Sequence, residues 1–255
     1  MRKLKLVLEY DGENYHGFQL QPKLRTVQGE LEKAIRQVTR EKTRIIGAGR
    51  TDAGVHATHF VVSFKTKSKL SVRALVPILN GRLPDDIQVI KAEEVEDQFD
   101  ARRSAQSRTY IYTVVNGDYL PVSLRRIAFL VRPRLNLAQM KIAAKYLEGR
   151  HDFHSFCVAR RADENYFRKI EKIEIKVQIL SDYFRINKLR VITFRITANS
   201  FLYRMVRSMV GTLLEVGLDK LSPSVVRQIL RAKDRRQAGQ TAPPQGLTLV
   251  EIRYQ

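Results

Sequence analysis

Residues 47–57 read Gly47-Ala48-Gly49-Arg50-Thr51-Asp52-Ala53-Gly54-Val55-His56-Ala57, and no other stretch of the chain is as informative. One carboxylate, Asp52, stands among glycines and two residues after Arg50. Glycine lets the backbone approach a ligand closely and adopts dihedral angles that other residues avoid. An arginine near an aspartate favours the ionised carboxylate. The stretch is therefore typical of a loop that presents an ionised carboxylate as a nucleophile.

The spacing of these glycines alone also fits plainer interpretations. The simplest is a glycine-rich turn with a local Arg–Asp pair, and the spacing does not exclude it. A P-loop requires a lysine after its last glycine, and this stretch contains no lysine. The dinucleotide-binding fingerprint would require a glycine where Asp52 stands. Both nucleotide-binding motifs are therefore excluded.

The exact order of residues 50–57 is more specific than their spacing. It closely resembles the active-site signature of the tRNA pseudouridine synthase A family. Other segments resemble further blocks of that family, namely residues 10–12, 15–19, 26–31, 99–102, 108–112, 151–156, 205–211 and 241–247. Phe18 stands where the family pattern leads us to expect tryptophan, and residues 157–167 match no block of the family. The resemblance thus covers nearly the whole chain.

Hydrophobic periodicity predicts a βαββαβ order in the first part of the chain. Leu4, Leu6 and Leu8 alternate along a first strand, as expected when one face of a sheet is buried. The remaining predicted elements are a helix over 27–38, short strands over 44–48 and 59–64, a helix over 72–79 and a strand over 87–93.

The second part repeats this order as βαββα(α)β. Its predicted elements are a strand over 108–115, a helix over 137–147, strands over 173–179 and 189–197, helices over 201–216 and 223–232, and a final strand over 247–254. Two copies of the split βαβ unit predict an α+β protein with two ferredoxin-like halves and mostly antiparallel sheets. We place the halves at 1–105 and 106–255. The family resemblance implies a pseudouridine synthase fold, in which the halves join around a central cleft with the Asp52 loop at its floor.

The composition indicates a globular protein with a polyanionic partner. The chain has 255 residues, 44% of them hydrophobic, and a net charge of +20. Residues 1–105 hold 19 basic and 14 acidic residues, whereas residues 106–255 hold 27 and 12. If the partner is a nucleic acid, the second half should supply most of the phosphate contacts. Any one basic cluster is most often a solvated face, and the set as a whole favours RNA binding; the clusters are Lys65/Lys67/Lys69, Arg102/Arg103, Arg125/Arg126, Arg132/Arg134, Arg160/Arg161 and 231–236.

The sequence favours a cytoplasmic location. No apolar run approaches the roughly 20 residues of a membrane helix, and the N-terminus lacks the apolar core of a signal peptide. The single cysteine, Cys157, cannot form an internal disulfide and suits a reducing compartment.

The histidines form a poor set of metal ligands. His56/His59 and His151/His154 are each spaced i, i+3, but zinc sites usually take four nitrogen or sulfur ligands, and the chain has one cysteine. We therefore expect no metal and, because the implied reaction has no redox or phosphate step, no cofactor.

Five more residues are candidates for the site, most of them assigned a role by the family resemblance. Arg50 would position Asp52 and help keep it ionised, and Arg207 corresponds to the arginine that pairs with the catalytic aspartate. Tyr110 corresponds to the tyrosine that packs on the target base, and Leu249 to an apolar residue lining the pocket. Arg204, one turn before Arg207 on the predicted helix, is expected at the surface or on a phosphate.

The resemblance implies an enzyme that converts uridine to pseudouridine in the anticodon stem-loop of tRNA, at positions 38–40, and a homodimer. The alternative from another class is a non-catalytic RNA-binding protein with two RRM-like sheets. Nothing in the chain matches the aromatic RNP1 pattern of RRM proteins, which counts against that alternative. A tRNA binder with a decayed active site is a second alternative, and the intact Asp52 argues against it.

Overall fold

The structure, a computed structural model, describes residues 1–158, 165–181 and 188–254. The chain divides into two compact units. The first comprises Met1–Gln106 and Thr248–Gln255, and the second comprises Ser107–Leu247. The predicted basic pair Arg160/Arg161 and most of the unmatched segment 157–167 lie outside the described residues.

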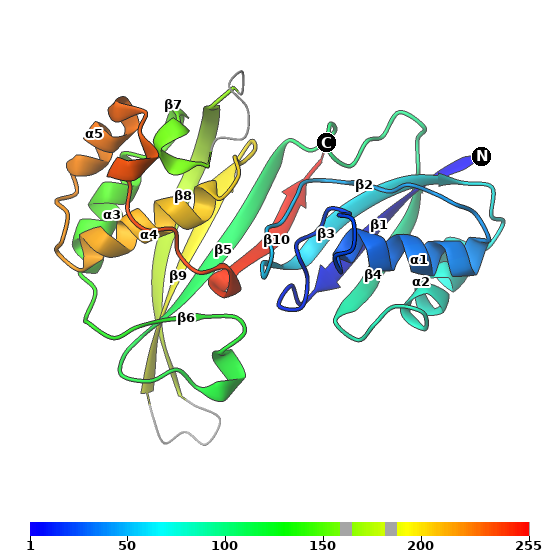
Figure 1. The fold of residues 1–255 in the computed structure, drawn as a ribbon, viewed down its shortest axis with the longest axis horizontal. Coiled ribbons are helices and arrows are strands. Elements are labelled where there is room, and N and C mark those ends of the chain that lie inside the picture. The colour runs from blue at the N-terminus through cyan, green and yellow to red at the C-terminus, as the bar shows by residue number, and fades with distance from the viewer. Residues whose placement is uncertain (159–164, 182–187, 255) are drawn as a thin grey trace. The chain divides into compact units, whose positions relative to one another are not determined.

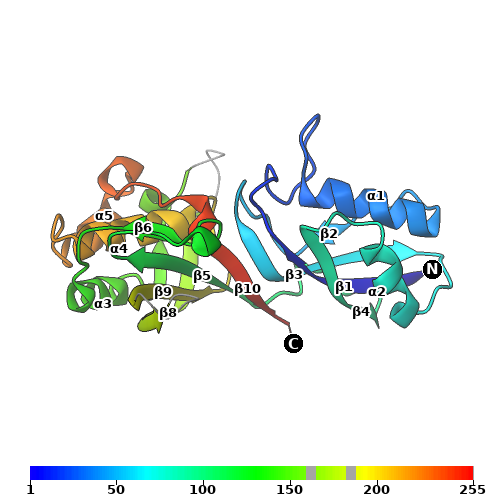
Figure 2. The same ribbon diagram turned by 90° about the horizontal axis from the view of Figure 1, so that it is seen from below.

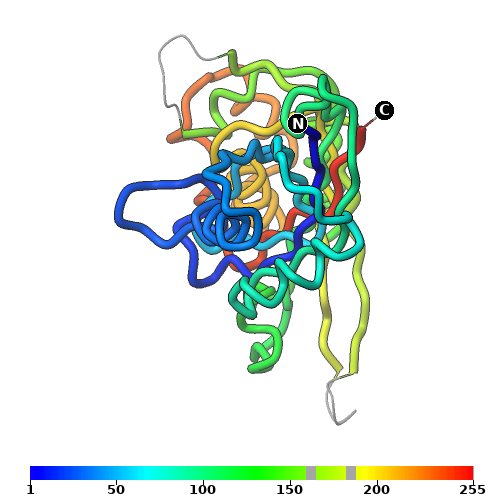
Figure 3. Tube along the Cα trace, turned by 90° about the vertical axis from the view of Figure 1, so that its right-hand side faces the viewer, coloured from blue at the N-terminus to red at the C-terminus, as the bar shows by residue number. Residues whose placement is uncertain are grey.

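The first unit is a sheet covered on one face by two helices (Figures 2 and 3). Its antiparallel strands lie in the order β4-β1-β3, with β1 at Arg2–Tyr10, β3 at His56–Thr66 and β4 at Ile87–Val95. The short strand β2 (Ile46–Gly47) pairs antiparallel with β3. The helices are α1 (Val27–Thr39) and α2 (Val72–Asn80). This βαββαβ order with β2 beside β3 is ferredoxin-like, as predicted.

Local sequence signals account for these elements. Leu4, Leu6 and Leu8 are all buried, so the alternating pattern of β1 does mark a core face. Helix α1 begins where the Thr26 hydroxyl accepts the Gly29 N–H at 3.2 Å, which satisfies one of the unpaired amides of a helix start.

The second unit has the strand order β5-β9-β8-β7, all antiparallel, with a short β6 parallel to β5 (Figure 1). The strands are β5 (Ser107–Asn116), β6 (Phe129–Val131), β7 (Gly149–Asp152), β8 (Phe167–Ser181) and β9 (Lys188–Ala198). The helices are α3 (Leu137–Lys145), α4 (Met205–Gly217) and α5 (Val225–Ala232). Helix α4 is the most deeply buried of the three. The protein is therefore α+β with mostly antiparallel pairing.

Three features differ from the sequence-based expectation. The last strand, β10 (Leu247–Arg253), was placed in the second half, but it pairs parallel with β3 of the first unit, Thr248 opposite His56. Strands β6 and β7 were not predicted, because each has only a few residues and periodicity needs a longer window. Helix α4 begins at Met205, four residues later than predicted.

The block at residues 99–102 packs against the first sheet. The Ala101 N–H donates to Ser63 Oγ at 3.2 Å, and the Tyr254 hydroxyl donates to the Ala101 carbonyl at 2.7 Å. The ring centroids of Phe99 and Tyr254 lie 5.1 Å apart. This resemblance block thus has a structural role in the first unit, which it ties to β10.

Candidate active site

Asp52 lies on the loop between β2 and β3. The loop is closed by a hydrogen bond from the Val55 N–H to the Asp52 carbonyl, 3.2 Å long. Gly54 inside this turn has φ +74°, a left-handed conformation that favours glycine. Asp52 is half-buried and Arg50 is exposed. The carboxylate therefore stands on a tightly closed turn from which it can be reached.

The segment that follows β1 lies along this loop and holds it. The Phe18 N–H donates to the Thr51 carbonyl at 3.2 Å, and the Gly54 N–H donates to the Tyr15 carbonyl at 3.3 Å. The hydroxyls of Tyr10 and Thr51 hydrogen-bond at 2.9 Å. The two resemblance blocks at residues 10–19 and 47–57 are therefore one structural assembly, with the carboxylate turn fixed on both sides of Asp52.

Glycines of the supporting segment make this contact possible. A Cβ atom on Gly12 would lie 2.0 Å from the Val55 carbonyl oxygen. A Cβ atom on Gly17 would lie 2.6 Å from the Thr51 carbonyl oxygen, and its φ of +89° already disfavours a side chain. Within the Asp52 loop itself, a Cβ on Gly49 would meet nothing within 4 Å. Of the glycines in residues 47–57, Gly47 also packs closely, since a Cβ there would lie 2.4 Å from the Phe18 ring. The close approach to the backbone of the Asp52 turn requires Gly12 and Gly17, which lie outside that stretch.

We expect Gly12→Ala to lower the catalytic rate at this site by about 10²-fold, because a shift of about 1 Å in the position of a reacting group costs about that much. The new methyl would overlap the Val55 carbonyl and displace the turn that carries Asp52. The matched control is Gly49→Ala, which adds the same methyl in open space and should leave the rate within a few-fold. Single-turnover rates of the two variants check this, and equal rates would contradict it.

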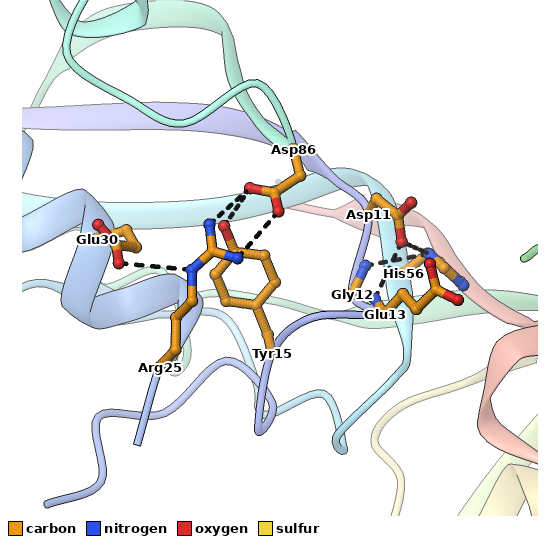
Figure 4. Close-up of polar contacts among 8 residues, drawn as sticks. All are labelled: Asp11, Gly12, Glu13, Tyr15, Arg25, Glu30, His56 and Asp86. Carbon is orange, nitrogen blue, oxygen red and sulfur yellow. Dashed lines mark hydrogen bonds and ion pairs between the residues drawn. The ribbon is translucent and has the colours of Figure 1, made fainter. Parts of the chain in front are cut away.

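A second cluster anchors the supporting segment at its far end (Figure 4). The Arg25 guanidinium lies 4.4 Å from the centroid of the Tyr15 ring and 3.3 Å from the Asp86 carboxylate. The Tyr15 hydroxyl donates to the same carboxylate, and Arg25 Nε is 3.6 Å from Glu30. Burial, followed by the hydrogen bond to Asp86, raises the pKa of Tyr15, so this hydroxyl stays a donor. Sequence reasoning missed this cluster, because its members come from separate segments.

Leu249 is the predicted pocket residue on β10. It is 2% exposed and lies opposite Ala57 in the parallel pairing with β3. It is therefore a strand neighbour of the residues that immediately follow the Asp52 loop, and its contact with a substrate stays a prediction.

Tyr110 lies on β5 in the second unit, opposite Ile196 of β9. It is half-buried, and its ring meets Phe201 edge to face with centroids 5.2 Å apart. Tyr112, two residues further along β5, is fully buried, and its hydroxyl donates to the Pro243 carbonyl at 2.9 Å.

Arg207 is half-buried in the first turn of α4, and the block at residues 241–247 orients it. Its Nε donates to the Ala242 carbonyl at 2.7 Å, and its own carbonyl accepts the Ala242 N–H at 3.0 Å. The Gly239 N–H donates to Thr212 Oγ1 at 2.9 Å, and a Cβ on Gly211 would lie 1.7 Å from the Gln240 carbonyl oxygen. The segment around Ala242 therefore packs along α4 and hydrogen-bonds to it, and this contact orients the Arg207 guanidinium.

Arg204 occupies a different setting from the one predicted. It is not one turn before Arg207 on the helix but is the residue that precedes α4, with a left-handed φ of +61°. It is exposed, and its guanidinium lies 5.0 Å from the Tyr203 ring. The predicted surface position agrees with this exposure, and a phosphate contact stays a prediction.

The histidine pairs do not form a metal centre in the part of the chain that the structure describes, where no three His, Cys, Asp or Glu side chains gather to hold an ion. His151 Nε2 lies 2.7 Å from the Glu148 carbonyl, and His154 stacks on Tyr166 with centroids 4.2 Å apart.

Within the described residues, no helix combines the length and the apolar character needed to span a membrane.

The structure places the predicted site residues in two groups. Arg50, Asp52 and Leu249 belong to the first unit, around the start of β3, and Tyr110, Arg204 and Arg207 belong to the second. Within each group the neighbouring elements are those described above.

Comparison with known proteins covers the chain from end to end. A family described as tRNA pseudouridine synthase matches residues 6–102 and 143–255. The tRNA pseudouridine synthase A of Thermoanaerobacter sp. (strain X514) is 44% identical over 254 residues, which cover all of both chains. The enzyme of the same name from Brevibacillus brevis is 42% identical over 254 residues, again across both chains. The tRNA pseudouridine synthase A 2 of Clostridium perfringens is 39% identical over the same length. The chain therefore belongs to the tRNA pseudouridine synthase family, a family of isomerases.

Proposed function

We propose that this protein converts uridine to pseudouridine at positions 38–40 in the anticodon stem-loop of tRNA, with Asp52 as its catalytic carboxylate. The observation that carries the proposal is the turn that presents Asp52, closed on itself and held by the segment after β1. Family membership supplies the reaction.

The reaction is an isomerisation that needs one carboxylate and controlled proton transfer. The C1′–N1 bond breaks, the uracil rotates while bound, and C5 joins C1′; C5 loses its proton and N1 gains one. Asp52 acts as nucleophile or stabilises positive charge at C1′. Attack on C6, attack on C1′ and a glycal intermediate are all compatible with this role. Since atoms and electrons balance without another reactant, the proposal includes no cofactor.

The other assigned residues position the carboxylate and the base in this proposal. The family resemblance assigns Arg50 and Arg207 to the positioning of Asp52. Tyr110 holds the flipped base, since stacking replaces contacts that the base loses when it leaves the helix. Leu249 supplies an apolar wall, and Arg204 binds a phosphate.

The reaction is tested by tritium release from tRNA that carries 5-tritiated uridine. A pseudouridine synthase releases the label, whereas the alternative, a non-catalytic RNA-binding protein, binds the tRNA and releases none. Transcripts that carry uridine at only one of positions 38, 39 and 40, or at none of these three, test which position is modified. Equal release from the transcript that lacks all three would refute the anticodon assignment.

We expect tRNA affinity to fall steeply with salt, because each phosphate contact releases counterions. The net charge of +20 suits a polyanion, and arginines such as Arg125 and Arg132 are exposed in the second unit. A chain of this charge plausibly neutralises on the order of 5–10 phosphates. The slope of log K against log salt measures this number, and a flat plot would contradict an electrostatic RNA surface.

We propose further that the protein is a homodimer and acts in the cytoplasm. The first proposal rests on the family resemblance, and the second on the tRNA substrate and the single buried Cys157. Light scattering at micromolar concentration should give twice the 29.5 kDa of the chain, and the mass of one chain would refute the dimer.

A further inference from the structure

His56 is a buried titratable side chain for which the proposed chemistry has no use. It is the first residue of β3, directly after the Asp52 loop, and is 4% exposed. Its Nδ1 lies 3.1 Å from the Gly12 N–H nitrogen and 3.1 Å from Asp11 Oδ1 (Figure 4).

These two contacts require opposite positions of the imidazole proton. The Gly12 amide can only donate, so Nδ1 must accept, and the proton of the neutral ring then lies on Nε2. A hydrogen bond to Asp11 would require the proton on Nδ1 instead. The Asp11 Oδ1 atom already accepts the Glu13 N–H at 3.0 Å, whereas the Gly12 amide is a fixed backbone donor. The geometry therefore favours the neutral ring with its proton on Nε2.

Packing alone does not explain why a histidine stands at this position, because of the surroundings of its Nε2 atom. It is buried, and among the residues that the structure describes no group forms a hydrogen bond with it. A buried polar atom without a partner lowers stability, and an apolar residue such as leucine would fill the volume without that cost. The Nδ1 contact is what leucine could not supply.

That contact bears directly on the Asp52 turn. Gly12 packs so closely on Val55 that a Cβ would lie 2.0 Å from the Val55 carbonyl oxygen, and the Val55 N–H closes the turn onto the Asp52 carbonyl. We propose that His56 is a positioning residue for Asp52: by accepting the Gly12 N–H, Nδ1 clamps residues 11–12 against the end of the turn and sets the place of the carboxylate. This inference rests on the proposed function of Asp52.

The test compares four substitutions in single-turnover reactions with saturating tRNA. His56→Asn keeps an acceptor, Oδ1, at the branch position of Nδ1, whereas His56→Gln, His56→Leu and His56→Ala do not. The last three should lower the rate by about 10²-fold and leave tRNA affinity unchanged, because a displacement of a reacting group by about 1 Å costs about that much in rate. His56→Asn should recover most of the loss. A wild-type rate for His56→Leu, or an Asn variant no faster than Gln, overturns the inference.

The tautomer of His56 tests the contact with the Gly12 amide independently of the variants. In wild-type protein labelled with ¹⁵N-histidine, the ring signal that disappears in His56→Asn should show the neutral form protonated at Nε2. A proton on Nδ1 would overturn the inference without any reference to folding of the other variants. Asp52→Ala is assayed in parallel. If it retains turnover, the assignment of Asp52 in the proposed function fails; if it is inactive while His56→Leu is fully active, only the role of His56 fails.

Discussion

Asp52→Ala is expected to abolish pseudouridine formation, with a loss of about 10⁴-fold or more, the scale seen when a nucleophile is removed. The physical reason is that one carboxylate carries the chemistry, and nothing on the turn that holds it replaces its charge. Affinity for tRNA should stay within a few-fold, because binding is spread over many cations of a chain with net charge +20.

Asp52→Asn refines this experiment, since it keeps the shape of the side chain and removes only the charge. The matched control is Asp85→Asn, which makes the same change at an exposed position of the first unit. Tritium release and filter binding on the three variants separate catalysis from binding. Measurable turnover by purified Asp52→Ala would end the assignment of Asp52, and a fall in affinity equal to the fall in rate would instead make Asp52 a binding residue.

Substitution of Tyr110 is expected to have the second large effect on the catalytic rate, and it distinguishes a stacking role of the ring from a proton-transfer role of the hydroxyl. If the ring only stacks on the flipped base, Tyr110→Phe keeps most activity and Tyr110→Ala loses it, with stacking worth about 1–3 kcal/mol. If the hydroxyl relays the C5 proton, the Phe variant is nearly as slow as the Ala variant, through loss of a general base worth about 10²–10⁴ in rate.

We expect the hydroxyl to matter, because phenylalanine at this strand position would suffice for stacking alone. The edge contact with Phe201 holds the ring in either variant with an aromatic side chain, so Tyr110→Phe should not disturb β5. The control is Tyr112→Phe, which removes a buried hydroxyl bonded to the Pro243 carbonyl and should lower stability more than the catalytic rate. Single-turnover rates on saturating tRNA decide the matter, and a fully active Tyr110→Phe would end the proton-relay role.

The local pattern of the sequence was sufficient for the elements of the first unit and for the candidate nucleophile. Alternation at Leu4, Leu6 and Leu8 acts between residues close in sequence, and the structure buries all three side chains. The order of residues 50–57 marked the Asp52 loop, and the comparisons confirm the family to which that order pointed. Such features are readable because a single strand or turn contains all the groups that define them.

The contacts that hold the candidate site in place join segments distant in sequence, and they are visible only in the folded chain. Parallel pairing puts β10 beside β3 in the first unit, and no periodicity within β10 could reveal its partner. Gly12 is required by a carbonyl of Val55, and the Ala242 carbonyl fixes the Arg207 guanidinium. In each case the constraint joins segments that are distant in sequence, so it arises from close packing and from the need to satisfy polar groups once the chain has folded. Residue types and their order thus point to the groups proposed for the chemistry, whereas contacts formed on folding hold the Asp52 turn and the Arg207 guanidinium in position.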